Sequence, residues 1–251
     1  MKSIIDYRFR IAVITVLMLI CVFAVPQAFA NKEYKIVSTN QLKAMFDKKQ
    51  PFTLIDARTT PEYKNAHIIK SVNIPDKKLQ ESLSLLPADK NSLLIIYCNG
   101  VKCGKSKRLA LQLEPLGYNN IMIYSEGIPV WEERNLPIIV GPDYEKKIDT
   151  TKLKPADINK MIQEKRTDYV LVDVRDPSEF KEGHIPTSIN IPSEVFASRS
   201  DILPKEKKII VACNTGSRSY LAYRKLIQLA YPDIYQTLIA DWKDAGLALE
   251  K

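Results

Sequence analysis

The sequence predicts an α/β protein made of two similar domains in tandem, each a parallel β-sheet covered by helices on both faces. Two observations support this fold class: a pattern that recurs after 117 residues, and strand-like apolar runs that alternate with helix-like stretches. A period of this length indicates duplicated domains, because solenoid repeats are only about 20 to 50 residues long. The chain is 45% hydrophobic and 26% charged, which argues against a disordered or fibrous protein.

The repeat is visible in residues of both halves that match at the same offset. The matching pairs are Asp56 and Asp173, Arg58 and Arg175, Glu62 and Glu179, His67 and His184, and residues 73–75 and 190–192. Each half also contains an apolar run that ends in a cysteine and is followed by a polar loop and a helix-like stretch. The two halves therefore share one strand, loop and helix order.

Within the first half, apolar runs of strand length occur at residues 52–56, 93–97 and 121–124. Helix-like stretches at residues 39–47 and 106–116 alternate with them. This alternation predicts crossover connections and hence a parallel sheet. The segment 141–151 is rich in turn and charged residues at its start, so we expect it to link one domain at residues 31–140 to another at 152–251.

The first 30 residues have the outline of a signal peptide. Basic residues precede an uncharged apolar run at residues 11–25, and the small-residue pattern at residues 28–30 follows. The run is shorter than the about 20 apolar residues that a membrane span needs. We therefore expect cleavage after Ala30 and export, to the periplasm, with no stable membrane insertion afterwards. An uncleaved anchor and a lipoprotein site at Cys21 are alternatives, the second disfavoured by the bulky Ile20.

The formal net charge of +8 makes the chain basic. Its lysines are dispersed along the sequence, which favours a solvated surface over a nucleic-acid interface, so we expect no nucleic-acid partner. Removal of residues 1–30 would leave Cys98, Cys103 and Cys213. An odd number of cysteines in an oxidising compartment indicates at least one free thiol.

The loop that begins at Cys213 has the features of a thiolate site. Cys213 ends an apolar run, and a helix-like stretch follows at residues 220–229. Amides at a helix N-terminus and the nearby Arg218 favour the charged form of a cysteine, and Gly216 can adopt a conformation that turns amides inward. The alternative is that Cys213 has only a structural role, as a small buried apolar residue at the end of a strand.

Taken together, these motifs resemble the rhodanese family over nearly the whole chain after residue 30. They are Asp173-Val-Arg175, Gly183-His-Ile185, Asn190-Ile-Pro192 and the Cys213 loop with Gly216, Arg218 and Ser219. The resemblance implies a double displacement, in which the Cys213 thiolate takes a sulfane sulfur from a small anionic donor such as thiosulfate. The persulfide then passes the sulfur to cyanide, a thiol or the thiol of a partner protein.

The resemblance implies no metal or organic cofactor. The substrate-binding residues that we expect are Asn214, Thr215, Gly216, Ser217, Arg218, Ser219 and Lys105. We interpret His67 and His184 as structural, because metal sites need clustered ligands. The Asp-x-Arg motif of each half predicts a buried ion pair that stabilises the fold.

The first cysteine loop departs from this pattern. It is two residues longer from Cys98 to Ser106, it has Lys105 in place of Arg218, and it holds a second thiol at Cys103. Cys98 is a second candidate nucleophile. Because Cys98 and Cys103 share one glycine-containing loop, we also expect that they can form a disulfide or that Cys103 can resolve a persulfide on Cys98. The alternative is that Cys98 stays reduced as an active nucleophile.

Two other classes of function compete with sulfur transfer. Cysteine-dependent phosphatases and arsenate reductases place five residues between cysteine and arginine, whereas four separate Cys213 from Arg218, which favours a single sulfur atom over a tetrahedral oxyanion. The other class is a redox or non-catalytic sulfur-carrier module that uses Cys98 and Cys103. The sequence leaves this second class open.

Overall fold

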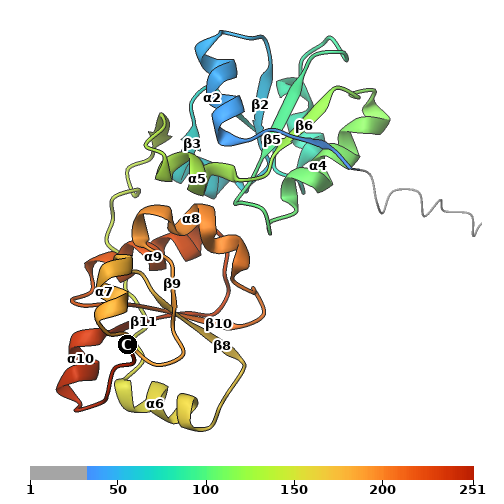
Figure 1. Ribbon diagram of the computed structural model, residues 1–251. Helices are drawn as coiled ribbons and strands as arrows, with labels where there is room; N and C mark the ends of the chain where they lie inside the picture. The colour runs from blue at the N-terminus through green and yellow to red at the C-terminus, as the bar shows by residue number, and fades with distance from the viewer. Residues whose placement is uncertain (1–32) are drawn as a thin grey trace, which may run out of the picture. The chain divides into compact units, whose positions relative to one another are not determined.

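The structure is a computed structural model that describes residues 33–251. Figure 1 shows the first repeat in blue to green and the second in yellow to red. The predicted signal peptide at residues 1–30 lies outside the described residues. Among residues 33–251, none of the helices is both long enough and apolar enough to cross a membrane.

The first repeat contains a five-stranded sheet whose strands are all parallel, in the order β1-β6-β5-β2-β4. The strands are β1 (Lys35–Ile36), β2 (Thr53–Asp56), β4 (Val72–Asn73), β5 (Leu94–Tyr97) and β6 (Ile121–Tyr124). A separate antiparallel pair is formed by β3 (Ala66–Ile68) and β7 (Ile138–Val140). Because parallel neighbours need long crossovers, helices connect most of the strands.

In the first repeat, a capping box between Thr59 and Glu62 fixes the start of the helix α3. In a capping box the two residues satisfy the free amides of the first helical turn. The helices of this repeat are α2 (Thr39–Asp47), α3 (Thr60–Asn65), α4 (Lys105–Leu113) and α5 (Gly127–Glu133), with 3₁₀ turns η2 (Leu79–Leu85) and η3 (Glu114–Leu116).

The second repeat contains a four-stranded parallel sheet in the order β11-β10-β8-β9. Its strands are β8 (Tyr169–Asp173), β9 (Ile189–Asn190), β10 (Lys208–Cys213) and β11 (Ile234–Leu238). Its helices are α6 (Pro155–Gln163), α7 (Pro177–Glu182), α8 (Phe196–Arg199), α9 (Ser217–Gln228) and α10 (Ile239–Asp244), with 3₁₀ turns η4 (Ser193–Val195) and η5 (Ser200–Ile202).

Each sheet buries an apolar cluster on both faces, because alternate strand residues point to opposite sides. In β10, Ile209, Val211 and Cys213 pack in the same cluster as Leu226 of α9. The intervening residues of β10 pack in a second cluster that contains Trp242 of α10. The fold prediction, two α/β domains with helices on both faces of parallel sheets, is therefore confirmed.

The segment before α6 lies against the second sheet. The amide of Gln236 donates to Thr151 O at 2.8 Å, and the amide of Leu153 donates to Gln236 O at 2.9 Å. The Tyr220 hydroxyl accepts from the Ile148 amide at 3.1 Å. Residues 148–153 therefore lie along β11, which places them beside the loop that follows β10.

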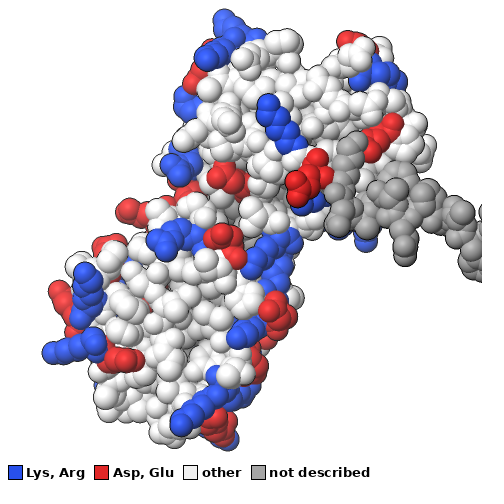
Figure 2. All heavy atoms as spheres, turned by 45° about the vertical axis from the view of Figure 1, so that its right-hand side comes forward, with Lys and Arg blue, Asp and Glu red and all other residues white. Residues whose placement is uncertain are grey.

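The charged side chains are interspersed on the face of the molecule that Figure 2 shows. Lysine and arginine alternate with aspartate and glutamate there, and neither sign forms one continuous patch on that face.

Candidate active site

The sulfur atom of Cys213 lies at the end of β10 and is surrounded by donors from the loop that follows. Cys213 Sγ accepts hydrogen bonds from the amide of Gly216 at 3.2 Å and from the amide of Ser219 at 3.3 Å. The Ser219 hydroxyl lies 3.1 Å from the same sulfur. Two backbone amides and one hydroxyl group therefore surround a buried sulfur atom.

Gly216 gives the loop its shape. Its φ of 109° lies in the left-handed region, where a side chain would strain the backbone. An added Cβ would meet only ordinary contacts, at 3.6 Å from Leu238, so the backbone conformation and not crowding requires glycine. This turn directs the Gly216 amide to Cys213 and starts α9 at Ser217.

A second layer of hydrogen bonds holds Ser219 in place. Gln236 of β11 is 3% exposed, and its Nε2 donates to Ser219 Oγ at 2.7 Å and to Gly216 O at 3.0 Å. The Thr150 hydroxyl donates to Gln236 Oε1 at 2.7 Å and fixes the orientation of the amide. Ser219 Oγ accepts from Gln236, and the hydroxyl lies within hydrogen-bond distance of both Gly216 O, at 3.2 Å, and Cys213 Sγ, at 3.1 Å.

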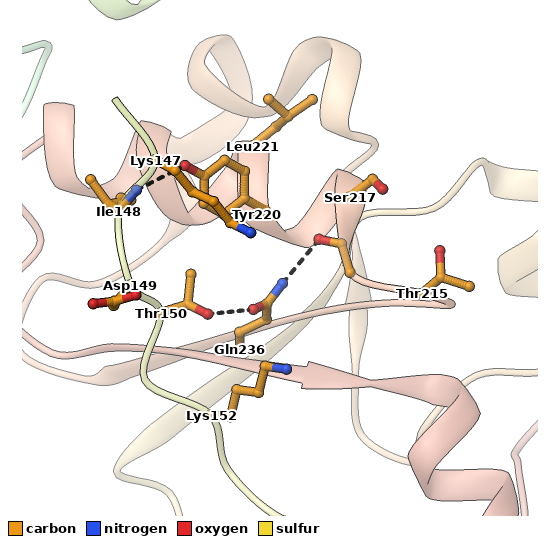
Figure 3. Close-up of a pocket in the computed structure, with 11 residues that line it drawn as sticks. Lys147, Ile148, Asp149, Thr150, Lys152, Thr215, Ser217, Tyr220, Leu221 and Gln236 are labelled. Atoms are coloured by element: carbon orange, nitrogen blue, oxygen red, sulfur yellow. Dashed lines mark hydrogen bonds between the residues drawn. The ribbon is translucent and has the colours of Figure 1, made fainter. Parts of the chain in front are cut away.

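A cavity of about 640 Å³ lies beside this loop. Figure 3 shows Gln236 at its centre, between Thr150 and the loop, with the side chains of Lys147 and Lys152 also lining the space. Thr215 and Ser217 line it from the loop, and both are exposed. The volume falls within the range of small-molecule sites.

The cation of the loop, Arg218, is held by a glutamate. Arg218 Nη1 and Nη2 donate to the two carboxylate oxygens of Glu179 at 2.5 and 2.8 Å. Asn214 Nδ2 donates to the same carboxylate at 3.1 Å. Glu179 is also the capping-box residue of α7, and it accepts from the amide of Asp176. One carboxylate thus fixes both ends of the Cys213 loop and the start of a helix.

These contacts change the acidity of the groups involved. Hydrogen bonds from Arg218 outweigh the opposing effect of burial and, with the Asp176 amide, lower the pKa of Glu179 to about 2. The hydrogen bond to Glu179 raises the pKa of Arg218 above its usual value, and the charge of Cys213 adds a smaller effect in the same direction. The two hydrogen bonds of the Arg218 guanidinium therefore go to Glu179.

The first repeat contains the same clamp with a lysine. Lys105 Nζ donates to Glu62 at 2.8 Å, and Asn99 Nδ2 donates to the other carboxylate oxygen at 2.8 Å. Burial raises the pKa of Glu62, but the hydrogen bonds from Lys105, Thr59 and Asn99 lower it to about 2. Lys105, predicted to bind substrate, is thus a partner of Glu62 in the structure.

Cys98 directly follows β5, whereas Cys213 is the last residue of β10. Cys98 is 1% exposed, and its sulfur lies 3.5 Å from Ser106 Oγ. The Cys103 thiol donates to Asn99 Oδ1 at 3.6 Å. Cys98, Cys103 and Cys213 are all free thiols in the structure. The predicted disulfide is absent from this state, and its formation under oxidising conditions stays a prediction.

The structural interpretations of the repeated motifs agree with the structure. Arg58 pairs with Asp56 at 2.6 Å and Arg175 pairs with Asp173 at 2.7 Å, and all four side chains are at most 5% exposed. His67 stacks on Tyr63, and His184 stacks on Phe180, each with 3.8 Å between ring centroids.. Among residues 33–251, no cluster of histidine, cysteine and acidic residues could hold a metal ion.

Sequence reasoning did not identify three residues that shape the site. Glu62 and Glu179 recur at the repeat offset, so their duplication was a usable signal, but their loop partners are distant in sequence. Gln236 is a polar residue inside an otherwise apolar strand, and only the structure shows that it supports Ser219.

Comparison with protein families identifies the class. A rhodanese-like domain matches the chain twice, at residues 38–134 and 154–244. The matches cover most of the chain and contain both cysteine loops. The chain belongs to the family of rhodanese-like proteins, as its motifs predicted.

Individual relatives are named as sulfurtransferases. The chain is 36% identical over 84 residues to a sulfurtransferase of Allochromatium vinosum, an alignment that covers 33% of this chain and 78% of that protein. It is 32% identical over 68 residues to the thiosulfate sulfurtransferase PspE of Escherichia coli, covering 27% of this chain and 62% of the relative. The chain therefore belongs with sulfurtransferases at the level of the family.

Among solved structures, a thiosulfate sulfurtransferase from Pseudomonas aeruginosa matches with a TM-score of 0.38 and 18% identity. The match covers 86% of this chain and 43% of that one, so the chain spans less than half of its length. The 3-mercaptopyruvate sulfurtransferase SseA of E. coli matches with a TM-score of 0.36 and 19% identity, over 81% of this chain and 97% of SseA.

Proposed function

We propose that this protein transfers sulfane sulfur from a small anionic donor of the thiosulfate type to a thiol or cyanide, mainly through a persulfide on Cys213. The observation that carries the proposal is the set of donors on Cys213 Sγ: the amides of Gly216 and Ser219 and the Ser219 hydroxyl. A persulfide is an anion of the size that such a cradle fits.

In the first step, the Cys213 thiolate attacks the sulfane sulfur of thiosulfate. A sulfur–sulfur bond forms to Cys213, the sulfur–sulfur bond of thiosulfate breaks, and sulfite leaves with the electron pair. In the second step, the acceptor attacks the terminal sulfur of the persulfide, and the Cys213 thiolate leaves. The donors of the loop stabilise negative charge on Cys213 at both stages.

The geometry of Arg218 disfavours phosphatase chemistry. A phosphate-binding arginine presents two donors to the anion. Both donor groups that Arg218 would use point instead to Glu179, at 2.5 and 2.8 Å. The same residues thus suit a single sulfur atom held by backbone amides better than a tetrahedral oxyanion.

The experiment is mass spectrometry of the full chain after treatment with thiosulfate. The peptide that contains Cys213 should gain the mass of one sulfur atom, and addition of cyanide should remove this mass and yield thiocyanate. The Cys213→Ser variant is the control, because serine keeps the size of the side chain without the thiolate. An unmodified Cys213 peptide in the wild-type protein would contradict the proposal.

We also propose that the protein acts outside the cytoplasm, in the periplasm. The basis is the sequence of residues 1–30, in which an apolar run precedes the small residues at 28–30. N-terminal peptide analysis of the protein expressed with this segment should find Asn31 as the first residue. If the exported protein retained residues 1–30, the proposed cleavage would be wrong. If the protein were recovered in the cytoplasm, the proposed export would be wrong.

A further inference from the structure

The cavity of about 640 Å³ beside the Cys213 loop is lined by two cations. Lys147 and Lys152 come from the segment that precedes α6, and Figure 3 shows their side chains on opposite sides of the Gln236 amide. The part of the chain that the structure describes offers no ion-pair partner to either lysine. Of the described residues that line the cavity, one is acidic, Asp149, so the charge of the lining is net positive.

The segment that carries these lysines is held in place beside the loop. The Thr150 hydroxyl donates to Gln236 Oε1 at 2.7 Å, and the Tyr220 hydroxyl of α9 accepts from the Ile148 amide at 3.1 Å. Lys152 pairs with Gln236 in a parallel bridge, and paired residues of a ladder point to the same face. Hydrogen bonds to β11 and α9 therefore fix the backbone from which both lysines extend.

The fold itself does not require a cation at this place. In the first repeat, β1 runs along β6 as the segment before α6 runs along β11, and Ile36 pairs with Ile123. These two positions correspond to Lys152 and Gln236, because Ile123 and Gln236 each pair with the strand residue two positions before the cysteine. A lysine and an amide thus replace two isoleucines in the repeat that contains Cys213.

The cavity and the sulfur atom share one residue of the loop. Gly216 lines the cavity, and its amide donates to Cys213 Sγ at 3.2 Å. Thr215 and Ser217, on either side of Gly216, are exposed and line the cavity as well. Cys213 is 2% exposed and is not part of the lining. The cavity therefore suits the body of a ligand whose reactive atom approaches the sulfur past Gly216, which has no side chain.

The size of the cavity and the spacing of the lysines indicate the kind of ligand. Thiosulfate and cyanide are far smaller than the cavity, whose volume lies in the range of organic ligands, about 300 to 1,000 Å³. Lys147 and Lys152 are five positions apart, so their Cα atoms can lie up to about 18 Å from each other. Ammonium groups bind carboxylates by charge-assisted hydrogen bonds. A ligand that contacts both lysines therefore needs two acidic groups separated by several bonds.

We propose that this cavity binds the sulfur acceptor, and that the acceptor is a peptide-sized thiol with a carboxylate towards each end. Lys147 and Lys152 bind the two carboxylates, and Asp149 is a partner for an amino group. The inference rests on the proposed function, because the acceptor takes its sulfur from the persulfide on Cys213. Cyanide reacts with the same persulfide and needs no contact with the lysines.

The transfer is a balanced displacement. The acceptor thiol loses its proton to solvent, and the thiolate attacks the terminal sulfur of the Cys213 persulfide. A sulfur–sulfur bond forms to the acceptor as the bond to Cys213 Sγ breaks, and the Cys213 thiolate leaves with the electron pair. The product is the persulfide of the acceptor, and no external oxidant or reductant takes part. The lysines act on binding, so they set the concentration of acceptor that is needed and not the maximal rate.

The test measures a single turnover in the full chain with Cys98→Ser, so that Cys98 carries no sulfur. The protein is loaded with thiosulfate, freed of the donor and mixed with glutathione, a tripeptide thiol with a carboxylate at each end and an amino group. Mass spectrometry follows the loss of the extra sulfur from Cys213. We expect the rate to saturate with glutathione. Glutathione diethyl ester has the same thiol without the carboxylates and should need an at least about tenfold higher concentration for half the maximal rate.

Two double variants are made in the same background. Lys147→Gln with Lys152→Gln should raise the half-saturating concentration of glutathione by about fivefold or more and leave the maximal rate unchanged. This variant should react with the ester and with cyanide as the parent does. Lys146→Gln with Lys154→Gln is the matched control, because it removes the same charge from exposed lysines of the same segment that are not part of the lining. It should behave like the parent with every acceptor.

Other outcomes overturn the inference. A rate that rises linearly with glutathione, or equal half-saturating concentrations for glutathione and its ester, excludes a carboxylate-binding site. Equal effects of the two lysine pairs show a general attraction by the basic surface in place of a site. Cyanide separates this inference from the proposed function. If cyanide removes the sulfur from Cys213 while glutathione does not saturate, this inference alone is wrong, and if Cys213 takes no sulfur from thiosulfate, both are wrong.

Discussion

The carboxylate of Glu179 accepts two hydrogen bonds from the guanidinium of Arg218, although the two residues are 39 positions apart in the sequence. The same carboxylate caps α7 and accepts from Asn214. The position of the Cys213 loop therefore depends on a residue outside the loop.

Replacement of Glu179 by glutamine should slow sulfur transfer by about fivefold to tenfold. The ion pair between Glu179 and Arg218 is partly exposed, so its loss should cost only about 1 kcal/mol of stability. The rate should fall because the Cys213 loop is then held less firmly. Arg218→Ala breaks the same contact. We therefore expect the double variant to be no slower than the slower single variant, as measured by thiocyanate formation. Fully additive losses would show that the two residues act independently.

Both capping glutamates should make the fold sensitive to acid. The folded-state pKa of Glu62 and of Glu179 is lowered to about 2 from 4.5. Between these values the unfolded chain binds more protons, so the stabilisation is complete above pH 4.5 and is lost as the pH falls to 2. The free energy of unfolding, measured by denaturant titration at several pH values, should decline over this window.

The double variant Glu62→Gln and Glu179→Gln should flatten this acid dependence. Glu81→Gln is the matched control, because the Glu81 side chain is 68% exposed. It should leave the slope as in the wild type. An equal decline in all three proteins would place the acid sensitivity elsewhere in the chain.

Gln236→Leu should reduce the reactivity of Cys213 without unfolding the second repeat. Leucine fills a similar volume but cannot hold the Ser219 hydroxyl, and loss of a buried hydrogen bond costs about 1 kcal/mol. We expect alkylation of Cys213 at neutral pH and sulfur transfer each to slow by about fivefold. Unchanged alkylation with an intact fold would remove Gln236 from the site.

Ile123→Leu is the control for Gln236→Leu. Ile123 pairs with Ile96 in β5, two residues before Cys98, as Gln236 pairs with Val211, two residues before Cys213. The first repeat thus has an apolar residue where the second has the amide. Ile123→Leu should leave the alkylation of Cys213 unchanged.

Cys213→Ser should abolish most thiosulfate:cyanide sulfur transfer, by at least about a hundredfold, because the nucleophile is lost. Cys98→Ser should retain most of the activity, since the proposed transfer proceeds mainly through the persulfide on Cys213. Steady-state assays of thiocyanate formation separate the two. The assignment of the working repeat is wrong if Cys213→Ser stays active while Cys98→Ser is inactive.

The sequence predicted the fold well because its signals are local. The helix at residues 39–47 was predicted with the bounds that α2 has in the structure, where an apolar residue, Leu42, is buried and Ser38 caps the start. The second helix ends earlier than expected, because Pro115 follows the last turn and the chain continues as a 3₁₀ turn. Likewise, α9 begins at Ser217 and not at Tyr220, because polar loop residues form its first turn.

The candidate site was predicted only in part, for a physical reason. Cys213, Gly216 and Ser219 are close in sequence, so the strand, loop and helix order was enough to place donors around the sulfur. The partners of Arg218 and Ser219 come from α7 and β11, and such distant contacts leave no local pattern. Arg218 was expected to face the substrate, and its distant partner Glu179 could not be read from the loop alone.

The shared carboxylate also limits how this site can be re-engineered. A designer who grafts the loop of residues 213–219 onto another scaffold would transfer the nucleophile but leave behind its anchor, Glu179. The loop would then have a free arginine beside the sulfur and no fixed orientation. A working transplant has to carry α7 and the loop together, so the smallest portable catalytic unit is discontinuous in the gene.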